Sequence, residues 1–340
     1  MNESYKGYVI ATDYVEVNTG KDVSDELQKL ILDNPNRTIF FPDGVYTLSK
    51  PICTPANPIH AVHLELSKFA VLKASDDWTE KEAIVRLGAA EPFNNITTNG
   101  SNYGIIGGII DGNGVANGVS IDSGRESIIR EVSIKHTQIG IHIKHGANSN
   151  SSDADIMNVN IVGNGMPESI GVLVEGSDNT FTNMRIAHIE IGMKILAPSQ
   201  FLKNIHPLYT YDAGLEGRYA ESCAFWDDTL MESWYNNCYS DQFATGFRMK
   251  DGARLTYSDC FCFWYTSKGG KQYGFEADGR FHSIIRNSNV QLRDDAPNSA
   301  YLYVKEEGGK GRVESPITKT YVMTNKTYED YLYGEVLDKI

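Results

Sequence analysis

Four acidic residues in the middle of the chain have the types and spacing for acid–base chemistry: Glu190, Glu221, Asp227 and Glu175. When two carboxylates lie close together, both cannot ionise cheaply, so the pKa of one rises and that group becomes a candidate general acid. Such a pair can cleave a glycosidic bond, with retention at a separation of about 5 Å and with inversion at about 6.5–9.5 Å. Whether these acids meet depends on the elements that position them.

Cationic and aromatic side chains accompany the acids. Lys194 and Arg248 have the chemistry to hold a sugar carboxylate or sugar hydroxyls. The segment 198–239 is rich in aromatic and acidic residues, a combination that suits sugar subsites, because rings stack on apolar C–H faces while carboxylates bind hydroxyls. We expect Trp234 and Phe243, in contrast, to fill the protein interior. The remaining candidates for substrate binding are His142, Glu276, Trp226, Asp228 and Tyr211.

One sequence motif, a glycine followed by alternating apolar residues, repeats through this region. Its glycines are Gly118, Gly140, Gly171, Gly192, Gly246 and Gly274. The long gap after Gly192 closes if Cys223 takes the glycine's place, which leaves a repeat of about 21 to 23 residues, extended in places by loops. A repeat this short cannot bury its apolar face alone and must stack on its neighbours. Because the alternation has a period of two, the stacked elements are parallel strands wound into a solenoid.

Stacking turns equal positions of successive repeats into rows. With the glycine at position zero, the residues at +1 and +3 are apolar and must point inward, so −2, +2 and +4 are expected to point outward. Glu190 and Glu221 are then neighbours in the −2 row, about 5 Å apart. Glu175 and Asp227 stand two repeats apart in the +4 row, about 10 Å from each other. The +2 row contains His142, Lys194, Arg248 and Glu276.

The two ends of such a stack need covers, because an open sheet edge invites aggregation. At the N-terminus, Ser24 or Asp22 can cap a short helix whose Leu27, Leu30 and Ile31 share one face. We therefore expect an all-β chain in three parts. Residues 1–50 form an N-terminal cap and the first strands, residues 51–300 form parallel β-helix coils with inserted loops, and residues 301–340 form a C-terminal cap.

Three segments carry a family resemblance: 25–31 (DELQKLI), 39–46 (IFFPDGVY) and 108–114 (GIIDGNG). They resemble the first helix, the first strands and the start of the regular coils in pectate-lyase-like, single-stranded, right-handed parallel β-helix proteins. The resemblance implies a carbohydrate-active protein, since this superfamily includes polygalacturonases, lyases, fructan-acting enzymes and phage tailspike depolymerases. The polygalacturonase motifs Gly-His-Gly and Arg-Ile-Lys are absent, and neither Asp227-Asp228 nor Asp294-Asp295 lies where the Asp-Asp motif would require it.

The leading hypothesis is a glycoside hydrolase-like enzyme that cleaves or rearranges glycosidic bonds of an oligo- or polysaccharide. The four acids named above are its candidate catalytic residues, with Glu190 and Glu221 as the first pair. One alternative is a polysaccharide lyase, in which Lys194 or Arg248 abstracts a proton beside a uronate. Another is a fructan-type intramolecular transferase or hydrolase. A third is a non-catalytic glycan-binding module or a tailspike-type structural module.

Composition excludes other classes of function. Among 340 residues, 31 Lys and Arg against 44 Asp and Glu give a net charge of −13, which disfavours binding to nucleic-acid phosphates. No apolar run reaches the roughly 20 residues that cross a membrane. The five cysteines are an odd number and do not indicate a disulfide framework, and we expect Cys238 and Cys260 to pack in the core. No secretory signal is visible, which favours the cytoplasm, or secretion if a leader precedes this sequence.

The expected partner is the saccharide alone. No metal-ligand spacing and no phosphate-binding loop appears, so we expect neither a metal nor a cofactor. Solenoids of this kind associate side by side, and a homo-oligomer such as a trimer is compatible with the sequence.

Overall fold

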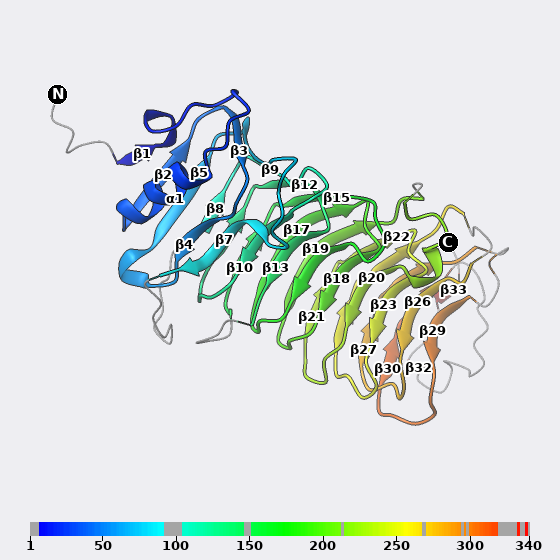
Figure 1. Ribbon diagram of the computed structural model, residues 1–340. Helices are drawn as coiled ribbons and strands as arrows, with labels where there is room; N and C mark the ends of the chain where they lie inside the picture. The colour runs from blue at the N-terminus through cyan, green and yellow to red at the C-terminus, as the bar shows by residue number, and fades with distance from the viewer. Residues whose placement is uncertain are drawn as a thin grey trace. The chain divides into compact units, whose positions relative to one another are not determined.

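The computed structural model describes residues 7–91, 104–145, 151–211, 214–266, 270–293, 296, 299–318, 332–333 and 337–338 (Figure 1). These residues belong to two compact units. The N-terminal unit comprises residues 1–164 and 175–179, and the C-terminal unit comprises residues 165–174 and 180–340.

Parallel strands form three stacks in the N-terminal unit (Figure 1). The first stack contains β1 (Tyr8–Ile10), β2 (Arg37–Phe41), β5 (Val62–Leu66), β8 (Gly104–Ile106), β11 (Ile128–Arg130) and β14 (Asp155–Met157). The second contains β3 (Gly44–Leu48), β6 (Ala70–Ala74), β9 (Ile109–Asp111), β12 (Ser133–Thr137) and β15 (Asn160–Gly163). The third contains β4 (Ile52–Pro55), β7 (Ala83–Ala90), β10 (Asn117–Ile121) and β13 (Ile139–Ile143).

The C-terminal unit repeats this arrangement. Its first stack contains β17 (Thr180–Ala187), β19 (Phe201–Leu208), β21 (Trp234–Asn236), β24 (Thr256–Ser258), β27 (Ile284–Arg286), β30 (Arg312–Glu314) and β32 (Leu332–Tyr333). The end of β19 also pairs with the second stack, which contains β22 (Tyr239–Asp241), β25 (Phe261–Phe263), β28 (Asn289–Gln291), β31 (Ile317–Thr318) and β33 (Leu337–Asp338). The third contains β16 (Ile170–Val174), β18 (Ile191–Ile195), β20 (Cys223–Asp227), β23 (Thr245–Met249), β26 (Tyr273–Ala277) and β29 (Ala300–Val304).

The core consists of like side chains aligned from one coil to the next. In the C-terminal unit, Phe225, Phe247 and Phe275 are buried and stack with ring centroids 4.8 and 5.0 Å apart. Cys238 and Cys260 are free and buried, as the spacing predicts. Stacking the coils removes from water the apolar surface that one coil could not bury by itself. The parallel stacks confirm the predicted parallel β-helix class.

The one α-helix among the described residues, α1 (Ser24–Asp33), covers the start of the third stack in the N-terminal unit (Figure 1). Its buried face contains Leu27, Leu30 and Ile31, as predicted. Gln28 accepts a hydrogen bond from the Cys53 amide at 2.7 Å and donates one to the Cys53 carbonyl at 3.0 Å. The helix therefore satisfies the free edge of β4, which is what a solenoid end requires. Three short 3-10 turns complete the helical elements of the described chain, at η2 (Ala11–Asp13), η3 (Pro58–His60) and η4 (Tyr219–Glu221).

Coil strands lie on both sides of the expected boundaries at residues 50 and 300. β2 and β3 pair with β5 and β6, and β29 pairs with β26 in the same parallel register as the strands before it. Beyond residue 318 the structure describes only β32 and β33, which add to the first two stacks.

Candidate functional site

The register of β20 decides which side chains of the third stack face outward. Ile191 pairs with Cys223, and Lys194 pairs with Trp226. Ala224 therefore occupies the glycine's place, and the prediction that Cys223 does so is wrong by one residue. Because side chains alternate along a strand, a shift of one residue exchanges the inward and outward sets. Trp226 and Asp228 consequently lie on the outward side, and Asp227 points into the core.

Asp227 is fully buried, which contradicts its predicted outward position. Its Oδ1 accepts hydrogen bonds from the amide and the hydroxyl of Thr229 at 3.1 and 2.6 Å, and its Oδ2 accepts one from the Tyr235 hydroxyl at 2.8 Å. Burial raises the pKa of Asp227 from 3.8 to about 6 in spite of these bonds. With both oxygens bonded inside the core, this acid is not placed to reach a substrate.

Glu190 and Glu221 do not form the predicted pair of outward acids. Glu190 is buried, and the residue opposite it in the −2 row is Ser222, which is also buried. Glu190 makes a bidentate ion pair with Arg218, at 2.8 and 3.0 Å, and accepts the backbone amide of Glu168 at 2.9 Å. Glu221 is exposed on η4. A neutralised structural ion pair thus takes the place of the expected acid pair.

A tryptophan held between two cations dominates the outward side of the third stack in the C-terminal unit. The Lys194 ammonium and the Arg248 guanidinium carbon each lie 4.5 Å from the centre of the Trp226 ring. These three side chains come from β18, β20 and β23, which the parallel register places side by side. Cations over the faces of an indole ring are attracted by its negative π-surface, so the three groups hold one another in place.

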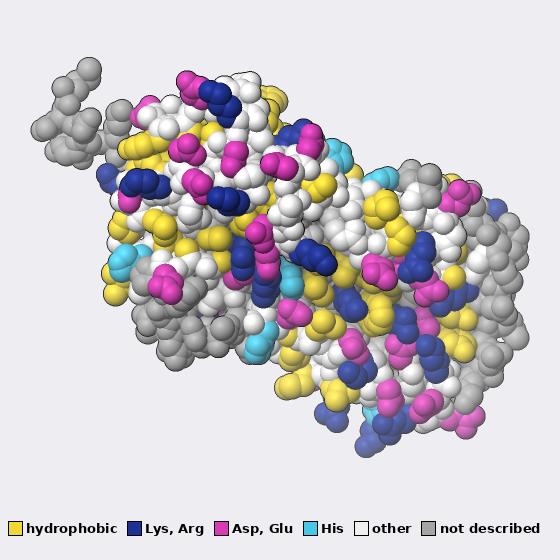
Figure 2. Space-filling model, viewed as in Figure 1, with side chains coloured by type: hydrophobic (Ala, Val, Ile, Leu, Met, Phe, Trp, Pro, Cys, Tyr) yellow, Lys and Arg dark blue, Asp and Glu magenta, His cyan; other side chains and the backbone are white. Residues whose placement is uncertain are grey.

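Charged residues flank this tryptophan on the same side. The Arg248 Nε donates to Asp278 at 2.7 Å, and the Lys250 ammonium lies 3.1 Å from Asp228. Burial opposes ionisation of Asp278, but hydrogen bonds from Arg248 and Lys305 outweigh it and lower the pKa of this carboxyl. We call the whole set the tryptophan face: Lys194, Trp226, Asp228, Arg248, Lys250, Lys271, Glu276, Asp278 and Lys305. Positive and negative side chains are intermingled on the side that carries β18, β20, β23 and β26 (Figure 2).

Glu276 lies in the outward row but is covered by its neighbours. It is 3% exposed and accepts a hydrogen bond from the Thr245 hydroxyl at 2.9 Å. The ammonium groups of Lys305 and Lys271 lie 3.2 and 3.6 Å from its carboxylate. Glu276 therefore fixes two cations of the tryptophan face and is not itself open to a ligand.

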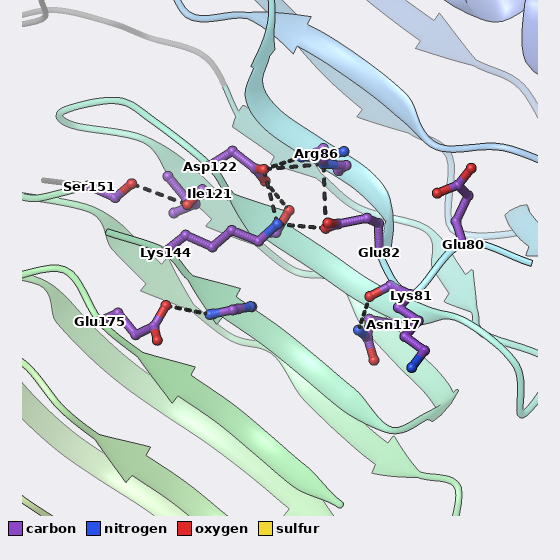
Figure 3. Close-up of polar contacts among 12 residues, drawn as sticks. Glu80, Lys81, Glu82, Arg86, Asn117, Ile121, Asp122, Lys144, Ser151 and Glu175 are labelled. Carbon is purple, nitrogen blue, oxygen red and sulfur yellow. Dashed lines mark hydrogen bonds and ion pairs between the residues drawn. The ribbon is translucent and has the colours of Figure 1, made fainter. Parts of the chain in front are cut away.

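His142 and Glu175 belong to a separate charge network in the N-terminal unit (Figure 3). The His142 Nε2 lies 2.9 Å from Glu175. Beside this pair, Arg86 and Lys144 both bind Asp122, and Lys144 also binds Glu82 at 2.6 Å. The network comes from β7, β10 and β13, from Glu82 just before β7, and from residues that follow β10, β13 and β16 in the chain. Each of its acids has a basic partner, so the predicted pairing of Glu175 with Asp227 is replaced by separate partners for each acid.

Three aromatic residues singled out in the sequence remain: Tyr211, Phe243 and Trp234. Tyr211 packs against Tyr209 and Tyr219, with ring centroids 5.3 and 5.6 Å apart, in a tyrosine cluster. Phe243 is fully buried as predicted, but Trp234 is 36% exposed and stacks on Phe201 at 4.7 Å. The Asp294-Asp295 dipeptide lies outside the described residues.

Sequence reasoning missed several residues that shape these sites, among them Arg86, Arg218, Lys271 and Lys305. Arg218 lies in a loop before η4 that belongs to no repeat, so no periodic signal could place it against Glu190. Lys305 was accessible to prediction: it stands four residues after Tyr301, which occupies the glycine's position in β29. Extending the repeat by one more coil would have placed it in the +4 row.

Two kinds of feature are absent from the described residues. They contain no group of three or more His, Cys, Asp and Glu side chains arranged to hold a metal ion. None of their helices is long and apolar enough to span a membrane.

Solved structures share this fold at low sequence identity. The tailspike protein of E. coli bacteriophage HK620 in complex with pentasaccharide matches with a TM-score of 0.68 and 10% identity, over 97% of this chain and 64% of that one. Tailspike gp49 of Acinetobacter baumannii bacteriophage Fri1, a capsular polysaccharide depolymerase, matches at 0.58 and 11%, over 99% and 65%. PfbA, a surface adhesin of Streptococcus pneumoniae, matches at 0.58 and 10%, over 92% and 91%.

These likenesses define the class of fold, a parallel β-helix like those of phage tailspikes and adhesins. The chain spans a little under two thirds of the length of the tailspikes it matches. No protein-family model and no curated protein matches the sequence.

Proposed function

We propose that this chain is a glycan-binding module of the tailspike or adhesin kind, and that its tryptophan face binds an acidic saccharide. The observation that carries the proposal is the tryptophan face itself. It holds five cations and three carboxylates in a chain whose net charge is −13. A locally cationic surface on a rigid sheet suits a carboxylate-bearing sugar.

Lys194 is the group best placed to meet such a ligand. It makes no ion pair with any described residue, and its contact is with the Trp226 ring. Arg248 donates from its Nε to Asp278, and its guanidinium lies against the same ring. Because Lys194 has no ion pair with a described residue to give up, a sugar carboxylate can bind its ammonium beside the ring without breaking an existing pair.

The pairing of the acids favours binding over cleavage. A glycosidase needs one acid that holds a proton and a second that is free to act on the substrate. Among the described candidates, Glu190, Glu175 and Asp228 each have a basic partner, and Asp227 is enclosed in the core. Glu221 is the one described candidate catalytic acid left exposed, whereas a glycosidase needs two. The solved structures that share the fold include a depolymerase as well as an adhesin, so cleavage is tested alongside binding.

The decisive experiment compares matched acidic and neutral ligands. Polygalacturonate and its fully methyl-esterified form share one backbone and differ at the carboxyl group, which is an anion in the first and a neutral methyl ester in the second. Binding to each is followed by tryptophan fluorescence and biolayer interferometry. We expect the acidic form to bind at least about tenfold more tightly, and Lys194→Ala and Trp226→Ala to lose about tenfold or more of that affinity. Trp234→Ala is the matched control, because this partly exposed ring lies in the first stack.

Equal affinity for the two forms, or undiminished binding by Lys194→Ala, would refute the proposal. New reducing ends or absorbance from an unsaturated product in the same mixtures would instead assign the chain to the hydrolases or the lyases.

A further inference from the structure

A cleft of about 610 Å³ lies over β3 and β6 in the N-terminal unit. Its polar lining residues are Asn18, Thr47, Lys73, Ser75, Asp76, Asp77 and Asn113. None of them belongs to the tryptophan face or to the His142 network. The volume falls within the range of about 300–1,000 Å³ that small-molecule sites occupy.

Backbone pairing and side-chain bonds fix the walls of this cleft. Thr47 and Lys73 are register partners on β3 and β6. The Asn18 side-chain oxygen accepts a hydrogen bond from the Val45 amide at 2.9 Å, and the Asn18 backbone amide donates to the Val45 carbonyl at 3.0 Å. These two bonds tie the preceding loop to β3. On the other side, the Asn113 side chain donates to Asp76 at 2.7 Å. A ligand would therefore meet groups that are already positioned.

Several polar groups of the lining keep bonding capacity. The Lys73 ammonium makes no ion pair or hydrogen bond with any described residue. Asp76 uses one carboxylate oxygen on Asn113, and Asp77 uses one on the Ser75 hydroxyl. The cleft thus offers a charged donor and two partly free charged acceptors, with amide and hydroxyl groups between them.

We propose that this cleft binds a neutral sugar ring through its vicinal hydroxyls. A sugar hydroxyl both donates and accepts, so one hydroxyl can donate to Asp76 or Asp77 while it accepts from Lys73. Two exposed carboxylates disfavour an acidic sugar, and the Lys73 ammonium disfavours a metal cation. The lining contains no aromatic ring, so a single sugar ring binds weakly, with a Kd of about 1 mM or more.

Saturation-transfer difference NMR of the full chain with glucose, galactose, mannose and N-acetylglucosamine tests the proposal. We expect at least one of these sugars to receive saturation. We expect Lys73→Met and the double variant Asp76→Asn, Asp77→Asn each to weaken its binding about fivefold or more. Lys81→Met is the matched control, an exposed lysine outside the cleft, and should bind like the parent. Because the substituted side chains lie at the surface, circular dichroism and Tm should be unchanged.

Two results would overturn the inference: no transfer to any of the four sugars, or full transfer with the double aspartate variant. The test is independent of the function proposed above. Lys194→Ala should leave the neutral sugar bound, and Lys73→Met should leave polygalacturonate bound, so failure at one site is distinguishable from failure at the other.

Discussion

The ionisation of Asp227 is coupled to folding because this carboxyl is enclosed in the core of the C-terminal unit. Its pKa of about 6 in the folded chain lies above the ordinary value of 3.8. Between these two values the folded state keeps a proton that the unfolded state has released. The free energy of unfolding therefore falls as the pH rises from about 4 to about 6, and the contribution levels off above that window. Over the whole window, the ionisation of Asp227 lowers the free energy of unfolding by about 3 kcal/mol.

Asp227→Asn should remove this part of the pH dependence. The amide has the same shape and does not titrate, and its oxygen can still accept from Thr229. Urea unfolding of the parent and the variant at pH 4 and pH 7 measures the effect. The parent should lose about 3 kcal/mol more than the variant over this interval. Asp259→Asn, a change in an exposed acid of the same unit, is the control and should keep the parent's pH dependence. Equal losses for parent and Asp227→Asn would contradict the prediction.

At the scale of the strand, the recurring glycine marks a position where coils approach closely. A Cβ atom on Gly192 would lie 2.3 Å from the Ala224 carbonyl oxygen and 2.7 Å from the Pro207 Cβ. Backbone atoms cannot move away as a flexible side-chain tip can, so we expect Gly192→Ala to lower the free energy of unfolding by about 1–3 kcal/mol.

Ala224→Gly is the matched control for that substitution, because Ala224 occupies the equivalent position one coil later. It introduces no clash and should cost about 0.5–1 kcal/mol through lost backbone restriction. Urea unfolding midpoints with unchanged slopes report both effects. A Gly192→Ala chain as stable as the parent would show that the contact does not explain the glycine.

The repeat was sufficient to predict the fold class but not the register of every coil. The buried face of α1 and the interior positions of Cys238 and Cys260 follow from periodicity. The error at β20 arose because Ala224 replaces the glycine that marks position zero elsewhere. Its consequence was large, since one residue of slip moved Asp227 into the core and Trp226 onto the surface.

Contacts made by loops lie beyond what periodicity can predict. Arg218 reaches Glu190 from a loop, and the fold brings together residues that are 28 positions apart in sequence. The expectation that Trp234 fills the interior is wrong, because its place in β21 gives the inward direction to Tyr235, which is 1% exposed. Alternation along the strand decides which of the two neighbouring rings is buried.

For the whole molecule, two charge effects act on an acidic glycan in opposite directions. The net charge of −13 repels a polyanion at long range, whereas the cations of the tryptophan face attract its carboxylates at contact. The salt concentration distinguishes the long-range repulsion from the attraction at contact, because the Debye length is about 30 Å at 0.01 M, about 8 Å at 0.15 M and about 3 Å at 1 M. Moderate salt screens the long-range repulsion but leaves contacts of about 4 Å largely intact.

The association rate constant for polygalacturonate should therefore rise between 0.01 and 0.15 M salt, and affinity should fall again at 1 M, when the contacts themselves are screened. Biolayer interferometry over this series measures both quantities. Lys194→Ala should retain the initial rise, which depends on the net charge, and should lose most of the fall at high salt, which depends on the contact. A steady decrease from the lowest salt onward would mean that local attraction governs the approach of the ligand at every distance, and that the acidic remainder of the chain has no part in it.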